Sequence, residues 1–180
     1  MPYQLYPEAS EEGEDKFAWY KKTRYSESDE KMNMYMNLMG SYGAAEGIDF
    51  KFGGIVANTL QAHRLIQHYQ ETKGPATADD IVKSLYKQYF EEERHPAAYE
   101  TLLRAATEAG IDEKDAKDFI EDRNEGLAEV KMLIRDQVSN QVDSVPRIKF
   151  EGKRRDFELE GAKEVAEYVA TLNKVIRESS

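Results

Sequence analysis

The chain has 180 residues, no cysteine, a formal net charge of −10 and a pI of about 4.9. This charge argues against general binding to nucleic acids or anionic membranes, because polyanions would be repelled at long range. It still allows a small anion in a local basic pocket. The lack of cysteine removes disulfides and thiolate metal sites together.

Nothing in the sequence directs the chain to a membrane or out of the cell. No apolar run approaches the roughly 20 residues that span a bilayer. The first residues, Met1–Tyr6, lack the basic flank and apolar stretch of a secretion signal, and neither end carries a lipidation motif. These features predict a cytoplasmic protein.

The first third of the chain mixes extended and helical patterns. Residues 3–6 are expected to form a short strand, and a polar loop follows through Gly13. Aromatic residues indicate a short helix over 17–25, and methionines spaced by three and four indicate a helix over 28–45. Residues 48–52 alternate like a strand or an extended loop.

Five helices are expected next. Asn58 is a favourable N-cap for a helix that ends at Gly74. Each of the other four helices has its own signal. Thr77 and Asp80 resemble a capping box, and Pro96 suits a first helical position. Asp112 is an N-cap, and an apolar face runs from Leu127 towards Gln141.

The hydrophobic period then changes from helical to alternating. Residues 145–150 and 156–159 are predicted to form a hairpin around Gly152, and an apolar face from Val165 to Ile176 predicts a final helix. The element order indicates an α/β fold that is mainly helical.

Motifs for catalysis or metal binding are absent, so the candidate chemistry is sparse. His63, His68 and His95 show no metal-ligand spacing, and no phosphate-binding glycine loop or nucleophile elbow is present. His63 and Arg64, near the start of the Asn58 helix, could bind an anion at the helix N-terminus. The alternative is structural pairing of these two residues with nearby carboxylates.

Several segments together resemble DsbA-like proteins of the FrnE type. They are Pro2–Pro7, Gly47–Phe50, Asn58-Thr59, Ala62–Leu65, Leu85-Tyr86, Tyr89–Glu91, Ala109–Ile111, Val142 with Ser144-Val145-Pro146, and Gly161 with the last helix. The resemblance covers nearly the whole chain. It departs at Gln141, where glycine is common in the family.

The resemblance implies an incomplete thioredoxin-like fold with an inserted all-helical domain. Residues 1–57 would be a remnant of the thioredoxin-like N-terminal half, residues 58–125 the helical insertion, and residues 126–180 the C-terminal half. The implied activity is that of an oxidoreductase in thiol–disulfide exchange. Two alternatives stay open: a glutathione-dependent relative such as a 2-hydroxychromene-2-carboxylate isomerase, and a non-catalytic binding or assembly protein on the same scaffold.

The resemblance also implies a ligand site. In this fold the residue before a cis-proline presents its main-chain N–H and C=O to an extended peptide or to glutathione. That role corresponds to Val145, with Ser144 before it and Pro146 holding the bend. Asn58, His63 and Arg64 complete the candidate ligand-binding residues, and glutathione is the candidate small molecule. The family's active-site segment has no counterpart in this sequence, so no catalytic residue is assigned.

The missing active-site strand would leave residues 3–6 and 147–150 without the strand between them. Leu5, Ile148, Phe150 and Val169 would then lie open. Three outcomes are expected: the remaining strands close up, a second copy covers them as a homodimer, or the protein has further N-terminal residues.

The 180-residue chain is predicted to lack disulfide reductase, oxidase and isomerase activity. Exchange requires a thiolate that attacks a disulfide sulfur, and the only sulfur here is the thioether of methionine. An insulin-reduction assay on the pure chain checks this, with thioredoxin as the positive control. Turnover above the protein-free rate would contradict the prediction.

Overall fold

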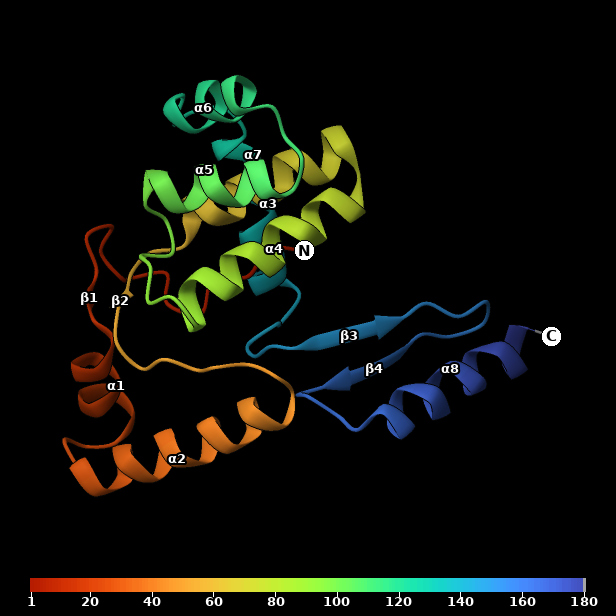
Figure 1. Cartoon of the computed structure of the whole chain (residues 1–180). Helices are drawn as coiled ribbons and strands as arrows, with labels where there is room; N and C mark the ends of the chain where they lie inside the picture. The colour runs from red at the N-terminus through yellow and green to blue at the C-terminus, as the bar shows by residue number, and fades with distance from the viewer. Residues whose placement is uncertain (180) are drawn as a thin grey trace. The chain divides into compact units, whose positions relative to one another are not determined.

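The structure, a computed structural model, describes residues 1–179 and divides into two compact units (Figure 1). The larger unit contains Pro2 and residues Gln4–Met132, and the smaller unit contains Met1, Tyr3 and the chain from Leu133. The sequence predicts boundaries at residues 57 and 125, whereas the chain leaves the larger unit near residue 132. This difference arises because the first turn of a helix at residues 127–139 buries Val130 completely in the larger unit.

A two-stranded ribbon and two helices form the first part of the larger unit. Strand β1 (Glu14–Asp15) pairs antiparallel with β2 (Ile55–Val56), a pairing that the sequence patterns do not predict. Gly13 precedes β1 with φ +75°, and a Cβ there would collide with the side chain of Ile55 and the carbonyl oxygen of Val56. Only glycine therefore permits this close approach of the two segments.

Helices α1 (Lys16–Arg24) and α2 (Asp29–Ala45) follow, within two residues of the predicted ranges. Each has a side-chain cap: Asp15 accepts from the Ala18 N–H at 2.8 Å, and Ser28 accepts from the Lys31 N–H at 3.3 Å. The segment 48–52 is an extended loop and not a strand.

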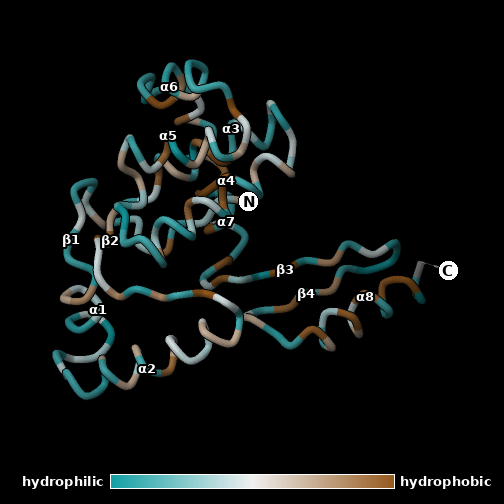
Figure 2. Tube along the Cα trace, in the orientation of Figure 1, coloured by the Kyte–Doolittle hydropathy of each residue, from teal (hydrophilic) through white to brown (hydrophobic). Residues whose placement is uncertain are grey.

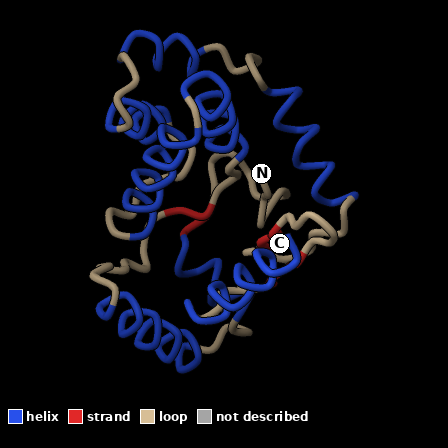
Figure 3. The backbone as a smooth tube through the Cα atoms, turned by 90° about the vertical axis from the view of Figure 1, so that its right-hand side faces the viewer, coloured by secondary structure: helices blue, strands red, loops and turns tan. Residues whose placement is uncertain are grey.

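Four helices build the main hydrophobic core of the larger unit: α3 (Leu60–Lys73), α4 (Pro75–Phe90), α5 (Tyr99–Glu108) and α6 (Glu113–Glu121). Their buried side chains form one cluster: Ala62, Leu65, Tyr69, Ile81, Leu85, Leu102, Ala105, Ala106, Ile111, Ala116, Phe119 and Ile120. Figure 3 shows that nearly all regular backbone in the molecule is helical.

Two predicted helix starts are wrong. Helix α4 begins at Pro75, so Thr77 lies inside the helix and is not its cap. The fixed φ of proline suits the first helical position, and it starts the helix two residues before the expected capping box. Pro96 lies in a turn before α5, whose first residue is Tyr99. The prediction for Asp112 is confirmed, since its side chain accepts from the N–H groups of Lys114 and Asp115.

The smaller unit holds most of α7 (Leu127–Ser139), the hairpin strands β3 (Arg147–Phe150) and β4 (Phe157–Glu160), and α8 (Val165–Ser179). The strands pair in a register that places Ile148 opposite Leu159 and Phe150 opposite Phe157. These four apolar residues are half-buried, and α8 packs against β3.

The apolar face of α8 is largely uncovered within the described chain. Val165, Val169, Leu172 and Ile176 are 49 to 75% exposed, and Figure 2 shows the apolar positions along this helix. Thr171, on a different face of α8, is the buried one.

The strand predicted for residues 3–6 does not form. This segment is irregular, and no other strand of residues 1–179 pairs with it. An extended segment without a neighbour leaves its main-chain groups unpaired, so it gains nothing from strand geometry. Leu5 is 60% exposed, as expected for an uncovered face.

Within the described residues, no helix has the length and apolar character that crossing a bilayer requires.

The substitution Leu85→Ala is expected to lower the free energy of unfolding by about 2–5 kcal/mol, because Leu85 is 8% exposed and belongs to the core cluster. Urea denaturation followed by far-UV circular dichroism measures the change. Tyr86→Ala is the matched control, since Tyr86 is the next residue of α4 and is 62% exposed. Equal costs for the two variants would show that the core is wrongly placed.

Candidate functional site

The loop between α7 and β3 contains the residues predicted to bind a ligand. Ser144, Val145 and Pro146 are all exposed, and the Val145–Pro146 peptide bond is cis. The carbonyl oxygen of Pro146 accepts from the N–H of Gly161 at 2.8 Å, which ties the loop to the residue after β4. The main-chain N–H and C=O of Val145 have no hydrogen-bond partner among residues 1–179. One main-chain donor and one main-chain acceptor are therefore unpaired at Val145 within the described residues.

A cavity of about 600 Å³ lies beside this loop in the smaller unit. It is lined by the N-terminal segment, the end of α7, the loop and one face of the hairpin. The lining residues include Tyr3, Gln137, Asn140, Val145, Arg147 and Glu158. The volume is within the range typical of small-molecule sites.

The two cationic side chains that line the cavity are both paired with carboxylates. Arg147 donates from Nε and Nη2 to a carboxylate oxygen of Glu158 at 3.1 and 2.6 Å, and from Nη1 to the carbonyl oxygen of Gln141 at 3.1 Å. Lys149 pairs with Asp156 at 2.7 Å, and this contact raises the pKa of Lys149. The cavity therefore has a polar wall in which each of these two cations already has an anionic partner.

The hairpin register explains this wall. Alternate residues of a strand point to opposite faces, so Arg147 and Lys149 lie opposite Glu160 and Glu158 on one face. The apolar residues of both strands occupy the other face. The sequence shows this alternation, but it contains no signal that a cavity lies on the charged side.

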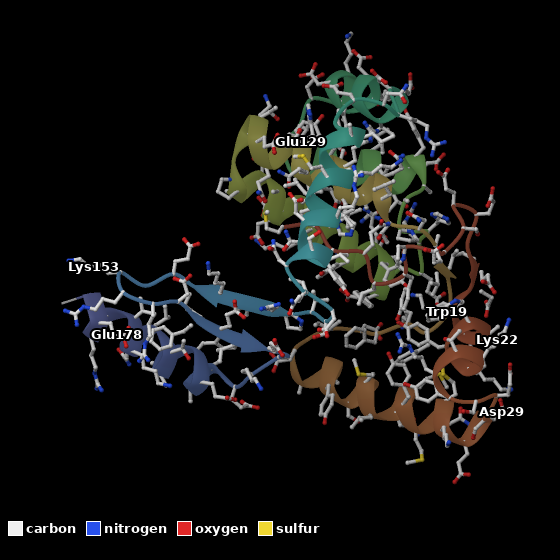
Figure 4. All side chains as sticks on the ribbon, turned by 180° about the vertical axis from the view of Figure 1, so that it is seen from behind. Trp19, Lys22, Asp29, Glu129, Lys153 and Glu178 are labelled. Carbon is white, nitrogen blue, oxygen red and sulfur yellow. The ribbon has the colours of Figure 1, made fainter. Side chains whose placement is uncertain are left out.

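The loop between the two strands is held to α8. Arg155 pairs with Glu178 at 2.5 Å, and Figure 4 labels Glu178 on α8 and Lys153 at the turn of the hairpin. Lys153 belongs to the basic cluster 153–155. Since Arg155 is already paired, this cluster is partly structural.

Arg64 has a structural role that excludes the predicted anion site. It is 1% exposed, and all five of its N–H groups have acceptors inside the protein. Nη1 donates to the carbonyl oxygens of Asp122 and Glu125 at 2.9 and 2.8 Å. Nη2 donates to the carbonyl oxygens of Phe119 and Ile120, and Nε donates to the side chain of Gln61.

The anion-binding prediction for Arg64 is therefore wrong, because no donor remains for a ligand. Its partners are main-chain carbonyls and a glutamine side chain, and not the carboxylates that the structural alternative names. Burial lowers the pKa of Arg64, and the nearby Asp122 and Glu125 act in the opposite direction.

Asn58 also serves the fold. Its Oδ1 accepts from the N–H of Leu60 at 2.9 Å, so its side chain caps α3 although Thr59 occupies the N-cap position. Its Nδ2 donates to the carbonyl oxygen of Pro7, and its Oδ1 also accepts from the side chain of Gln4. Asn58 thus fastens the N-terminal segment to the start of α3.

The histidines of α3 do not form a ligand cluster. His63 is half-buried, and its ligand role stays a prediction. His68 stacks on Phe119 with ring centroids 4.0 Å apart, and burial lowers its pKa. Among the described residues, no group of three His, Asp or Glu side chains is placed to hold a metal ion.

The comparison with protein families decides the class of this chain. The model of the DSBA-like thioredoxin domain matches residues 2–173. The chain belongs to this family. The match includes both units, the Val145 loop and most of α8, so the mainly helical thioredoxin-like fold expected from the sequence is confirmed.

A solved structure supports the same fold for the DsbA-like chain. This chain is similar to the crystal structure of a probable DsbA oxidoreductase from Streptomyces coelicolor, with a TM-score of 0.81 and 19% sequence identity. The similarity covers 99% of this chain and 74% of that one. A comparison with curated proteins found no match.

The substitution Arg64→Lys is expected to destabilise the protein by at least about 2 kcal/mol. Lysine keeps the charge but cannot reach the four carbonyl oxygens at once, and each buried acceptor left without a donor costs about 1–3 kcal/mol. Arg123→Lys is the control, because Arg123 makes an exposed ion pair with Glu11 that a lysine can also form. Urea denaturation of both variants tests the prediction, and a near-neutral Arg64→Lys would refute the proposed role of the guanidinium.

Proposed function

We propose that this chain provides the ligand-binding part of a DsbA-type oxidoreductase and holds an extended thiol peptide, such as glutathione, on the main chain of Val145. Membership of the DSBA-like family supports the oxidoreductase class. The choice of a peptide or glutathione as the ligand is the more specific part of the proposal. It rests on the geometry of the loop between α7 and β3.

The observation that carries the proposal is the unpaired main chain of Val145. Its N–H and C=O lack partners among residues 1–179, and the residue is 42% exposed. An extended peptide satisfies such a pair by adding itself as a short strand, with one hydrogen bond in each direction. Because glutathione is itself a short peptide, it can offer both a C=O and an N–H.

The neighbouring cavity would then receive the side chains or the ends of the ligand. Since Arg147 and Lys149 are already paired with Glu158 and Asp156, their charges are largely engaged before a ligand binds. Recognition would rest mainly on main-chain hydrogen bonds. Such a site favours an extended shape and tolerates different side chains.

The redox-active sulfur has to come from outside these 180 residues, because they contain no cysteine. This fact favours a second candidate, a binding or assembly protein on the same scaffold that holds a peptide without turnover. A glutathione-dependent isomerase or transferase would share the same main-chain contacts. Binding is common to the three functions, whereas disulfide turnover or isomerisation by the assembled protein would separate them.

Titration with S-methylglutathione, followed by NMR of ¹⁵N-labelled protein, tests the binding. Saturable shifts are expected for the amides of the loop and the hairpin. Val145→Pro removes the N–H and is expected to weaken binding by about tenfold, the value of one good hydrogen bond. Val145→Ala keeps both main-chain groups and is expected to bind like the unmodified chain.

Two results would contradict the proposal. One is the absence of saturable shifts in the loop. The other is an equal loss of affinity in Val145→Ala and Val145→Pro, which would assign the contact to the side chain. The same spectra report whether the hairpin of each variant is folded, through the dispersion of its amide signals.

A further inference from the structure

The larger unit buries a lysine that plays no part in the proposed peptide site. Lys16 is the first residue of α1 and is 5% exposed. Its Nζ donates to the carbonyl oxygen of Tyr89 at 2.9 Å and lies 3.8 Å from the centroid of the Tyr89 ring. An ammonium has three donors, and this carbonyl is its one hydrogen-bond acceptor among residues 1–179.

A small cavity of about 40 Å³ lies beside Lys16. Its walls are mostly aromatic rings and methionine side chains, including Tyr20, Met32, Tyr35, Phe52, Tyr89 and Phe90. A water molecule needs about 10–15 Å³ on this measure, so the space holds about three non-hydrogen atoms. A small neutral molecule with an apolar part fits these walls, because most of them are apolar.

The cavity lies close to the surface. Lys51 lines it, and the side chain of Lys51 is 46% exposed and paired with Asp49 at 2.7 Å. Small neutral molecules therefore have a short path from solvent beside Lys51.

We propose that Lys16 is a Schiff-base-forming lysine, and that its cavity selects small neutral aldehydes of about three non-hydrogen atoms. The proposal concerns the larger unit alone and is independent of the peptide site at Val145. Buried lysines in apolar pockets are the usual carriers of this chemistry.

The reaction balances without a further reagent. The lone pair of the neutral Nζ attacks the carbonyl carbon, and the π electrons move to the oxygen. One proton then passes from the nitrogen to this oxygen and gives a carbinolamine. Loss of the remaining N–H proton and of the hydroxyl group, as one water molecule, forms the C=N bond. When the imine is protonated, its positive charge lies where the ammonium lay, over the ring of Tyr89.

The surroundings keep part of Lys16 neutral. Burial lowers the pKa of Lys16 to about 8, and the negative charge of Glu93 opposes this shift. About a tenth of the amine is then neutral at pH 7, compared with about one part in 2,500 for an exposed lysine.

The other titratable groups around the cavity keep their usual charge near neutral pH. Burial raises the pKa of Tyr20, Tyr35 and Tyr89, so these phenols are neutral, and the contact with Asp49 raises the pKa of Lys51. Between pH 6 and 9 the titration of Lys16 itself should therefore control its reactivity. Imine formation at Lys16 should rise with pH and level off above about pH 8.

Reductive alkylation of the folded chain tests the proposal. Acetaldehyde with cyanoborohydride converts each imine into an ethylamine, and peptide mapping by mass spectrometry gives an initial rate for every lysine. Lys16 is expected to react about tenfold or more faster than Lys22 at pH 7, because of its larger neutral fraction. Lys22 is an exposed lysine of the same helix and serves as the internal control (Figure 4).

Benzaldehyde provides the size control, because it is too large for the cavity and should not label Lys16 faster than Lys22. Phe52→Ala widens the wall and is expected to increase labelling of Lys16 by benzaldehyde, while labelling of Lys22 stays unchanged. Equal or slower labelling of Lys16 by acetaldehyde would overturn the proposal. Preferential labelling of Lys16 by benzaldehyde in the unmodified chain would overturn the size selection.

Discussion

The packing of the larger unit depends on one buried guanidinium. Water-free burial of a charge costs several kcal/mol, and the last carbonyl groups of a helix lack partners within that helix. Arg64 finds acceptors for its buried charge and gives donors to unpaired carbonyls at the same time. It donates to the carbonyls of Phe119 and Ile120 in α6 and to those of the turn that leads to α7. Its positive charge also lies at the negative end of the α6 dipole. Helix α3 is thereby joined to the end of α6 and the start of α7.

Lys16 is buried nearly as deeply as Arg64, but it has fewer hydrogen-bond acceptors around it. Arg64 has an acceptor for every N–H, so its burial contributes to stability and leaves no capacity for a ligand. Lys16 has one carbonyl and one aromatic face, and a small space lies beside it. The number of acceptors around each cation therefore separates a structural side chain from one with residual reactivity.

The smaller unit is ordered by main-chain and charged contacts more than by apolar burial. The face of α8 that carries Val165 and Ile176 stays exposed in the described chain, while Thr171 is buried. The hairpin is closed at one end by the hydrogen bond from Gly161 to Pro146, and its loop is joined to α8 by Arg155 and Glu178. These ties place the Val145 loop next to the charged face of the hairpin.

The sequence alone determined the features that depend on local chemistry. The period of the apolar residues predicts the helices and the hairpin, and Asp112 marks a helix start, because caps and periodicity involve only neighbouring residues. The position of the exposed Val145 loop also follows from the sequence, through the resemblance of its Val-Pro segment to the DsbA-like family.

The tertiary structure decided the features that depend on contacts between residues far apart in the sequence. The sequence predicts a strand at residues 3–6 that has no partner, and it lacks any signal for the β1–β2 pair, because strand pairing depends on segments about 40 residues apart. It also cannot show whether the charge of Arg64 faces solvent or carbonyls. A side chain's role depends on the acceptors around it, and those around Arg64 include carbonyls that lie 55 to 61 positions away along the chain.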